Sequence, residues 1–215
     1  MSNRLLIASA STFACASTAL AGIVNEYVPA WRGSANATYS GWDAFTSAYA
    51  GPNAPDEAGS AQASLFNFGP GAIVTGGGNI YGSSGPLSIF ITGGVLSAPN
   101  APLEVVLNVG TAGTFLDTSS VTFSAITSTG TVGFAPTTSE LRFDQPTPGF
   151  GSVQTRTFTW DLSALPISAV GYQITFRSVE QYMSLTGVAV DLRFIPTPAA
   201  GVVLLAGLRG SRRRR

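Results

Sequence analysis

The sequence contains no histidine, no lysine and a single cysteine, Cys15. Histidine is the commonest general base near neutral pH and a frequent metal ligand, and lysine is needed for Schiff-base and Ser–Lys chemistry. Because Cys15 lies in a predicted signal peptide, the rest of the chain offers no disulfide, thiol nucleophile or cysteine-based metal site. We therefore expect a protein without enzymatic activity and without a resident cofactor.

The charges are distributed unevenly along the sequence. Residues 22–195 carry five arginines and all eleven acidic residues, which gives this part a net charge of −6, while the other six arginines lie near the two ends. Nucleic-acid binding requires clustered Lys and Arg, whose contacts with phosphate release counterions. We therefore expect no nucleic-acid partner.

The first 21 residues have the pattern of a secretory signal peptide. Arg4 supplies the positive charge, residues 5–16 are weakly apolar, and Ala19 and Ala21 are the small residues of a cleavage site before Gly22. This pattern predicts an exported protein whose mature chain begins at Gly22.

The other end of the sequence combines a proline-rich spacer, an apolar run and a basic end. Pro196, Thr197 and Pro198 precede the apolar residues 199–208, and the sequence closes with Arg212, Arg213, Arg214 and Arg215. Over about the last twenty residues this arrangement resembles the PEP-CTERM family of exported bacterial proteins, although Thr197 stands where the family usually has glutamate. The resemblance implies a sorting tail with a helical membrane segment, a protease of the exosortase type as partner, and a location in the cell envelope, on the cell surface or in the extracellular matrix.

Between these two signals the chain consists of short runs in which apolar and polar residues alternate, separated by Gly, Pro, Ser, Thr and Asn. The clearest apolar sets are Val170, Tyr172, Ile174 and Phe176, and then Val188, Val190, Leu192 and Phe194. A period of two is typical of strands with one buried face, and no convincing amphipathic helix lies between the runs. We predict an all-β domain over residues 22–195, an antiparallel β-sandwich that is jelly-roll-like, flanked by a signal peptide (1–21) and a sorting tail (196–215).

The stretch from residue 31 to residue 59 is less regular. It is compatible with a long ordered loop or with a first hairpin ending at Gly51-Pro52-Asn53. Among its aromatic residues, Trp42 beside Asp43 is expected to be partly exposed, whereas Trp160 is expected in the core. Exposed aromatic rings stack on sugars, so Trp42, Asp43 and Tyr182 are candidate ligand-binding residues.

Asp56 and Glu57 lie in a turn-rich segment and could supply oxygen ligands to calcium, although the spacing matches no fixed calcium loop and a plain polar loop is the better explanation. Glu140 and Asp144 are the candidate carboxylate pair of a glycosidase. Residues four apart in a strand are separated by ~13 Å, beyond the ~5–10 Å of such pairs, which favours a solvated strand face.

Three functions remain open at this point. The first is an exported protein with a structural or interaction role in the cell envelope or in exopolysaccharide. In that case exopolysaccharide is the expected partner. The alternative is a carbohydrate-binding module, and the third is a carboxylate-based glycosidase.

The tail makes a direct prediction about the mature protein. Replacing Arg212, Arg213, Arg214 and Arg215 with neutral residues should abolish envelope retention and processing, because the positive charges that hold the end on the cytoplasmic side are lost. Mass spectrometry of surface protein should find a C-terminus near Pro198. Freely soluble secreted protein with an intact Arg215 would contradict both claims.

Overall fold

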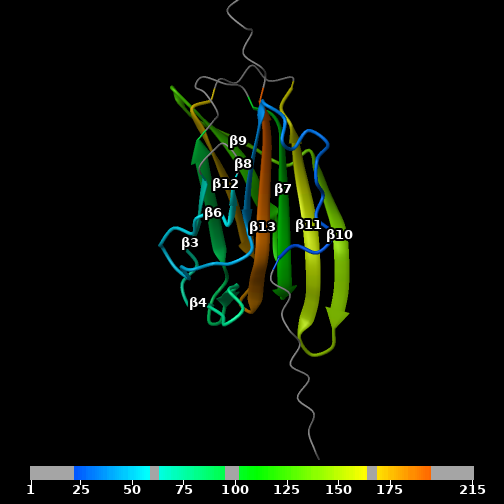
Figure 1. Cartoon of the computed structure of the whole chain (residues 1–215). Helices are drawn as coiled ribbons and strands as arrows, with labels where there is room; N and C mark the ends of the chain where they lie inside the picture. Colours follow the sequence, from blue (N-terminus) through cyan, green and yellow to red (C-terminus); the bar gives the residue numbers. More distant parts are fainter. Residues whose placement is uncertain (1–21, 59–62, 95–101, 164–168, 195–215) are drawn as a thin grey trace, which may run out of the picture.

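The computed structural model describes residues 22–58, 63–94, 102–163 and 169–194, which form two antiparallel β-sheets packed face to face (Figure 1). The predicted all-β sandwich is confirmed. The predicted signal peptide, with Ala19 and Ala21, and the predicted tail, with Pro196, Thr197, Pro198 and the four terminal arginines, lie outside the described residues. Within the described ranges, no helix has the length and hydropathy needed to cross a membrane.

The larger sheet has eight strands, which are β1 (Ala37–Trp42), β2 (Glu57–Ala58), β4 (Ala72–Val74), β5 (Ile80–Gly82), β7 (Pro102–Gly113), β10 (Thr138–Thr147), β11 (Gly151–Asp161) and β13 (Met183–Phe194). Their order is β10-β11-β7-β13-β1-β2, with β5 pairing with both β13 and β4. β13 therefore lies in the middle of the sheet, between β7 and β1.

The smaller sheet has five strands, which are β3 (Ala63–Asn67), β6 (Ser88–Gly94), β8 (Leu116–Thr127), β9 (Gly130–Phe134) and β12 (Gly171–Ser178). Their order is β3-β6-β12-β8-β9. All strand pairs in both sheets are antiparallel, and short turns join β8 to β9 and β10 to β11.

The core lies between the sheets and contains the apolar sets that the period of two predicted. The buried residues of β12 and β13 include Tyr172, Ile174, Phe176, Val188, Val190, Leu192 and Phe194. The prediction is wrong for Val170, which is 47% exposed. Val170 lies in a bend before β12 begins at Gly171, so the alternation of the strand does not extend to it.

Aromatic side chains fill the centre of this core. The ring of Phe123 lies 6.0 Å from that of Trp160 and 6.2 Å from that of Tyr172, measured between centroids. The indole N–H of Trp160 donates a hydrogen bond of 3.0 Å to the carbonyl of Phe134. The expected core position of Trp160 is thus confirmed, and its one polar group has a partner as burial requires.

The stretch that looked irregular in the sequence contains β1, a strand of the larger sheet that lies between β13 and β2. It pairs with β13 along its whole length, from Ala37 opposite Arg193 to Trp42 opposite Val188. It also pairs with β2, so the hairpin alternative is nearer to the structure than the loop. Small residues in β1 hid the alternation that longer apolar side chains would have given.

β13 is buried on both of its faces, unlike the half-buried strand that its sequence predicts. Ala189 and Asp191 point away from the core and are still buried. They are covered by residues 22–36, which we call the covering segment and which run over the outer face of the larger sheet (Figure 1). Asn108 of β7 binds it through two hydrogen bonds, accepting from the N–H of Tyr27 at 3.1 Å and donating to its carbonyl at 3.0 Å.

The register of β12 can be tested by comparing two phenylalanines. Phe176→Ala should destabilise the protein by ~3–5 kcal/mol, because Phe176 is buried between the sheets. Phe150→Ala should change stability by no more than about 0.5 kcal/mol, because Phe150 is 59% exposed in the turn between β10 and β11. Denaturant unfolding measures both, and equal losses would show that the core face is wrongly assigned.

Candidate binding sites on the two outer faces

Three phenylalanines gather on the outer face of the smaller sheet, and we call them the aromatic cluster. Phe66 of β3 lies opposite Phe90 of β6 in the strand register, and Phe68 directly follows β3. The ring centroids of Phe68 lie 5.9 Å from Phe66 and 6.1 Å from Phe90. Because the neighbours of these residues in the strands, such as Leu65 and Ile91, face the core, the cluster must face outward.

Two hollows adjoin the aromatic cluster. One, of about 300 Å³, is lined by Phe68 and Phe90 together with Ser120, Thr175 and Arg177. The other, of about 460 Å³, shares Phe68 and Arg177 and extends to Asp117 and Val179. Apolar ring faces therefore border hydroxyl groups, a guanidinium and a carboxylate on one surface.

The polar side of these hollows is held in place by hydrogen bonds. Arg177 Nε lies 3.2 Å from Asp117 Oδ2. The hydroxyl and backbone N–H of Ser119 both donate to Asp117 Oδ1, at 2.6 Å and 3.1 Å. The hydrogen bond from the Ser119 hydroxyl lowers the pKa of Asp117, and the hydrogen bond from Arg177 lowers it further. Asp117 is therefore ionised near neutral pH and acts as a hydrogen-bond acceptor, which suits binding better than proton transfer.

The aromatic cluster was not among the predicted sites, because a phenylalanine in a strand is usually a core residue. The spacing of Phe66 and Phe68 is a sequence signal for it, because residues two apart share one strand face while Leu65 lies on the other. The third ring, Phe90, joins only through the pairing of β3 with β6.

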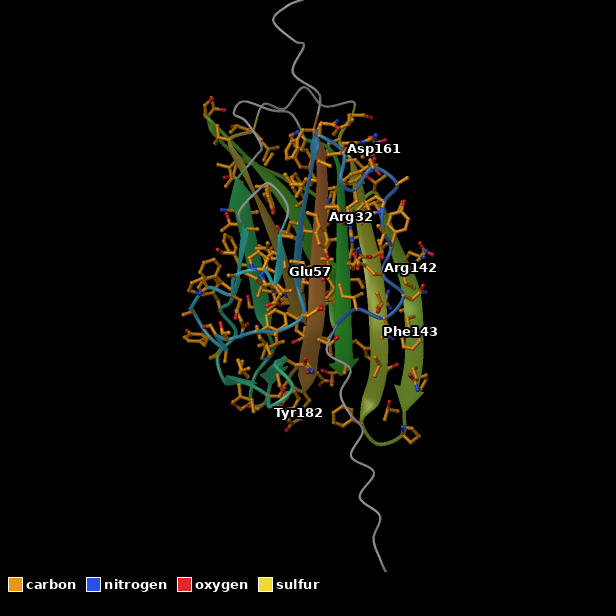
Figure 2. All side chains as sticks on the ribbon, in the orientation of Figure 1. Arg32, Glu57, Arg142, Phe143, Asp161 and Tyr182 are labelled. Atoms are coloured by element: carbon orange, nitrogen blue, oxygen red, sulfur yellow. The ribbon has the colours of Figure 1, made fainter. Side chains whose placement is uncertain are left out.

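The predicted ligand-binding residues do not form one site. The expectation that Trp42 is exposed is wrong, since its side chain is 0% exposed and its indole N–H donates to the carbonyl of Asn53. Asp43 is exposed, and it shares a hollow with Glu57. Tyr182 is exposed as well, but it stacks on Tyr81 with 6.5 Å between ring centroids. Figure 2 shows Tyr182 at the lower end of the sandwich, away from Glu57.

The hollow beside Asp43 has about 380 Å³, and we call it the acidic hollow. Its lining includes Gly22 and Glu26 of the covering segment, Tyr39 of β1, and Asp43 and Glu57. The Tyr39 hydroxyl donates to Glu57 Oε2 at 3.1 Å. The pKa of Asp43 is raised mainly by partial burial. The like charges of Glu57, Asp56 and Glu26 raise it further. The carboxylates around the hollow therefore repel one another.

The proposed calcium ligands have structural partners instead. Asp56 Oδ2 accepts hydrogen bonds from the backbone N–H groups of Asp43 and Ala44, both at 2.8 Å, which fixes the chain after β1. Glu57 accepts from Tyr39. In the part of the chain that the structure describes, no group of three or more acidic side chains is arranged to hold a metal ion. Asp56 and Glu57 are therefore explained without calcium.

The candidate glycosidase carboxylates also have neighbours that occupy them. Glu140 forms an ion pair of 3.0 Å with Arg142. Asp144 accepts hydrogen bonds from Ser152 and Gln154, which lower its pKa. These contacts agree with a polar strand face.

A buried ion pair joins the covering segment to β13. Arg32 donates from Nε to Asp191 Oδ1 at 2.6 Å and from Nη2 to Asp191 Oδ2 at 2.7 Å, and Nη2 also contacts Glu26. The side chain of Asp191 is 0% exposed. Burial raises the pKa of Asp191, and Arg32 offsets part of this rise. Figure 2 shows Arg32 lying over the larger sheet.

Comparisons with protein-family models, curated proteins and solved structures find no match to this chain.

The ion pair predicts how stability depends on pH. Arg32→Gln should destabilise the protein by roughly 3–5 kcal/mol at pH 7, because it leaves the buried carboxylate of Asp191 without a counter-charge. Without Arg32, the pKa of Asp191 in the folded state rises further above its unfolded value, so acidification protonates the buried group and the loss should shrink towards pH 4.

Denaturant unfolding of both proteins at several pH values measures this effect. Arg177→Gln is the matched control, because the Arg177–Asp117 pair is exposed on the opposite face and should contribute ~1 kcal/mol or less. A loss in Arg32→Gln that grows at low pH would contradict the account.

Proposed function

We propose that this protein is an exported bacterial β-sandwich that binds uncharged polysaccharide in the cell envelope or extracellular matrix and catalyses no reaction. Its structural role is that of an interaction module on the cell surface or within exopolysaccharide. The signal-peptide pattern before Gly22 and the PEP-CTERM-like tail from Pro196 to Arg215 support export and sorting by an exosortase-type protease.

We also propose that the sandwich is a jelly roll. A jelly roll has two four-stranded sheets between which the chain crosses repeatedly. The orders β11-β7-β13-β1 and β6-β12-β8-β9 support this assignment, as do the crossings from β6 to β7, from β7 to β8 and from β12 to β13. In this assignment β3 and β10 are additional edge strands.

The aromatic cluster beside two polar hollows is the observation that carries the binding proposal. A pyranose ring has an apolar C–H face, which packs against an aromatic ring, and hydroxyl groups at its edge, which need hydrogen-bond partners. Phe68 offers the ring, while Thr175, Arg177 and Asp117 offer donors and acceptors within the same two hollows. A shallow surface of this kind suits one side of an extended polymer.

The net charge of residues 22–195 favours binding of an uncharged polymer. Residues 22–195 carry a net charge of −6, so a polymer of uronic acids would be repelled. Arg177 does not reverse this preference, because it is paired with Asp117. Binding to the uncharged polymer should therefore depend little on salt concentration.

Binding can be tested by affinity electrophoresis and calorimetry with neutral polysaccharides. Phe68→Ala should weaken binding roughly two- to thirteenfold, because a stacked aromatic contact contributes ~0.5–1.5 kcal/mol. Phe150→Ala is the matched control, since Phe150 has similar exposure but lies in the turn between β10 and β11, which lines neither hollow.

Several outcomes would contradict the proposal. Equal affinity for the two variants would remove the aromatic cluster from the site. Binding that disappears at 0.5 M salt would indicate a charged partner, and shortening of the polysaccharide during incubation would indicate a glycosidase.

A further inference from the structure

Gly22 lines the acidic hollow, and its backbone N–H forms a hydrogen bond. Its N–H donates to the carbonyl of Thr186 in β13 at 3.0 Å. A β-carbon built on Gly22 would have three nearest neighbours, all of them atoms of the Asp43 carboxyl group, the closest being Oδ1 at 3.5 Å. The α-nitrogen is bonded to the same α-carbon, so it lies within about 6 Å of this carboxylate, close enough for strong electrostatic coupling.

Two glycines in neighbouring strands form a seat for this end of the covering segment, and we call them the glycine pair. Gly110 of β7 and Gly187 of β13 are opposite each other in the strand register. A β-carbon on Gly187 would lie 2.9 Å from Ile23 Cγ1 and 3.1 Å from the Gly22 carbonyl carbon, and one on Gly110 would lie 3.3 Å from the Gly22 oxygen. Only a flat, side-chain-free surface allows the backbone of Gly22 to lie this close to the sheet.

We propose that the acidic hollow binds the α-ammonium group of Gly22 that is created when the chain is cleaved after Ala21. In this step a signal peptidase uses one water molecule to break the Ala21–Gly22 amide bond. The hydroxyl goes to the Ala21 carbonyl carbon, which becomes a carboxylate, and the Gly22 nitrogen takes up protons to become –NH3⁺. The inference rests on the export proposed above but not on polysaccharide binding.

The geometry gives the new charge suitable partners. An ammonium has three donors, and one of them retains the bond to Thr186. The charged and titratable groups facing it are Asp43 and Tyr39 from β1 and the turn after it, Glu57 from β2 and Glu26 from the covering segment, with Asp56 and Arg32 next to them. Since Asp43 is repelled by its acidic neighbours, a cation at Gly22 relieves that repulsion and forms an ion pair.

The sign of the effect on stability follows from this pairing. An ordinary α-amino group has a pKa of ~7.7–8.0, and pairing with Asp43 raises it in the folded protein. The resulting stabilisation is fully present below about pH 7.7 and is lost as the pH rises through the raised value.

The experiment uses protein exported with its own signal peptide. N-terminal sequencing first establishes the first residue, and then the rate of amine acylation is measured as a function of pH. Because the sequence contains no lysine, the α-amino group is the single primary amine of the mature chain and the signal is unambiguous. The comparison peptide is Gly-Ile-Val-Asn, the sequence of residues 22–25.

We expect Gly22 as the first residue. The rate–pH midpoint should lie about one unit above that of the peptide, which corresponds to a tenfold higher proton affinity of the α-amino group. Asp43→Asn should lower this midpoint by most of that difference. Asp144→Asn, which removes a carboxylate of β10 outside the acidic hollow, should leave it unchanged. Gly187→Ala should also abolish the shift, because it displaces Gly22 from its seat.

A first residue other than Gly22, or a midpoint equal to that of the peptide, would overturn the inference. The same holds if Asp43→Asn and Asp144→Asn have the same midpoint. If Asp43→Asn does not fold, two other measurements test the inference. One is the rate–pH midpoint of the wild-type protein, and the other is that of a chain that retains Ala21, whose amine should titrate like the peptide. Polysaccharide binding by the same samples is measured separately, so failure of one proposal does not imply failure of the other.

Discussion

The arrangement of the larger sheet depends on one constraint, the burial of Asp191 on the outer side of its central strand. A carboxylate with no exposed surface is costly unless a cation and further hydrogen bonds compensate it. Arg32 meets this need with two hydrogen bonds, and to do so residues 22–36 must cross the outer face of β13 and β7. The covering segment in turn buries Ala189 and Asn108, so that the middle of the sheet has protein on both sides.

The two outer faces of the sandwich consequently differ in chemistry. The middle of the outer face of the larger sheet is covered, and the acidic hollow lies near β1 and β2. Among the described residues, no such segment covers Phe66, Phe68 and Phe90 on the face of the smaller sheet, which combines rings with hydroxyl groups and the Arg177–Asp117 pair. The smaller sheet therefore offers the accessible surface on which we propose polysaccharide binding, whereas the acidic hollow offers carboxylates to the cationic group that we propose there.

The period of two identified which residues of β12 and β13 share a face, since this depends on local geometry alone. It could not show that the opposite face of β13 is also buried, because the cover comes from residues at the other end of the chain. β1 was missed because Ala37, Ser40 and Gly41 are too small to show an apolar alternation. Trp42 was expected to be exposed because it neighbours Asp43, yet Trp42 is the last residue of β1 and is buried, whereas Asp43 lies in the exposed bend that follows. Two rings of the aromatic cluster share a strand face that their spacing indicates, but the third ring comes from a neighbouring strand and could not be placed from the sequence.

The glycine pair also has a consequence for the order of events during synthesis. Gly22 docks on residues 186 and 187, so the earliest described part of the chain meets a strand formed almost at its end. Contacts that close such a long loop form late in folding. Until β13 has been made and paired with β7, Gly22 has no sheet on which to dock. The cleavage that we propose before Gly22 would therefore act on an undocked chain only until β13 is in place.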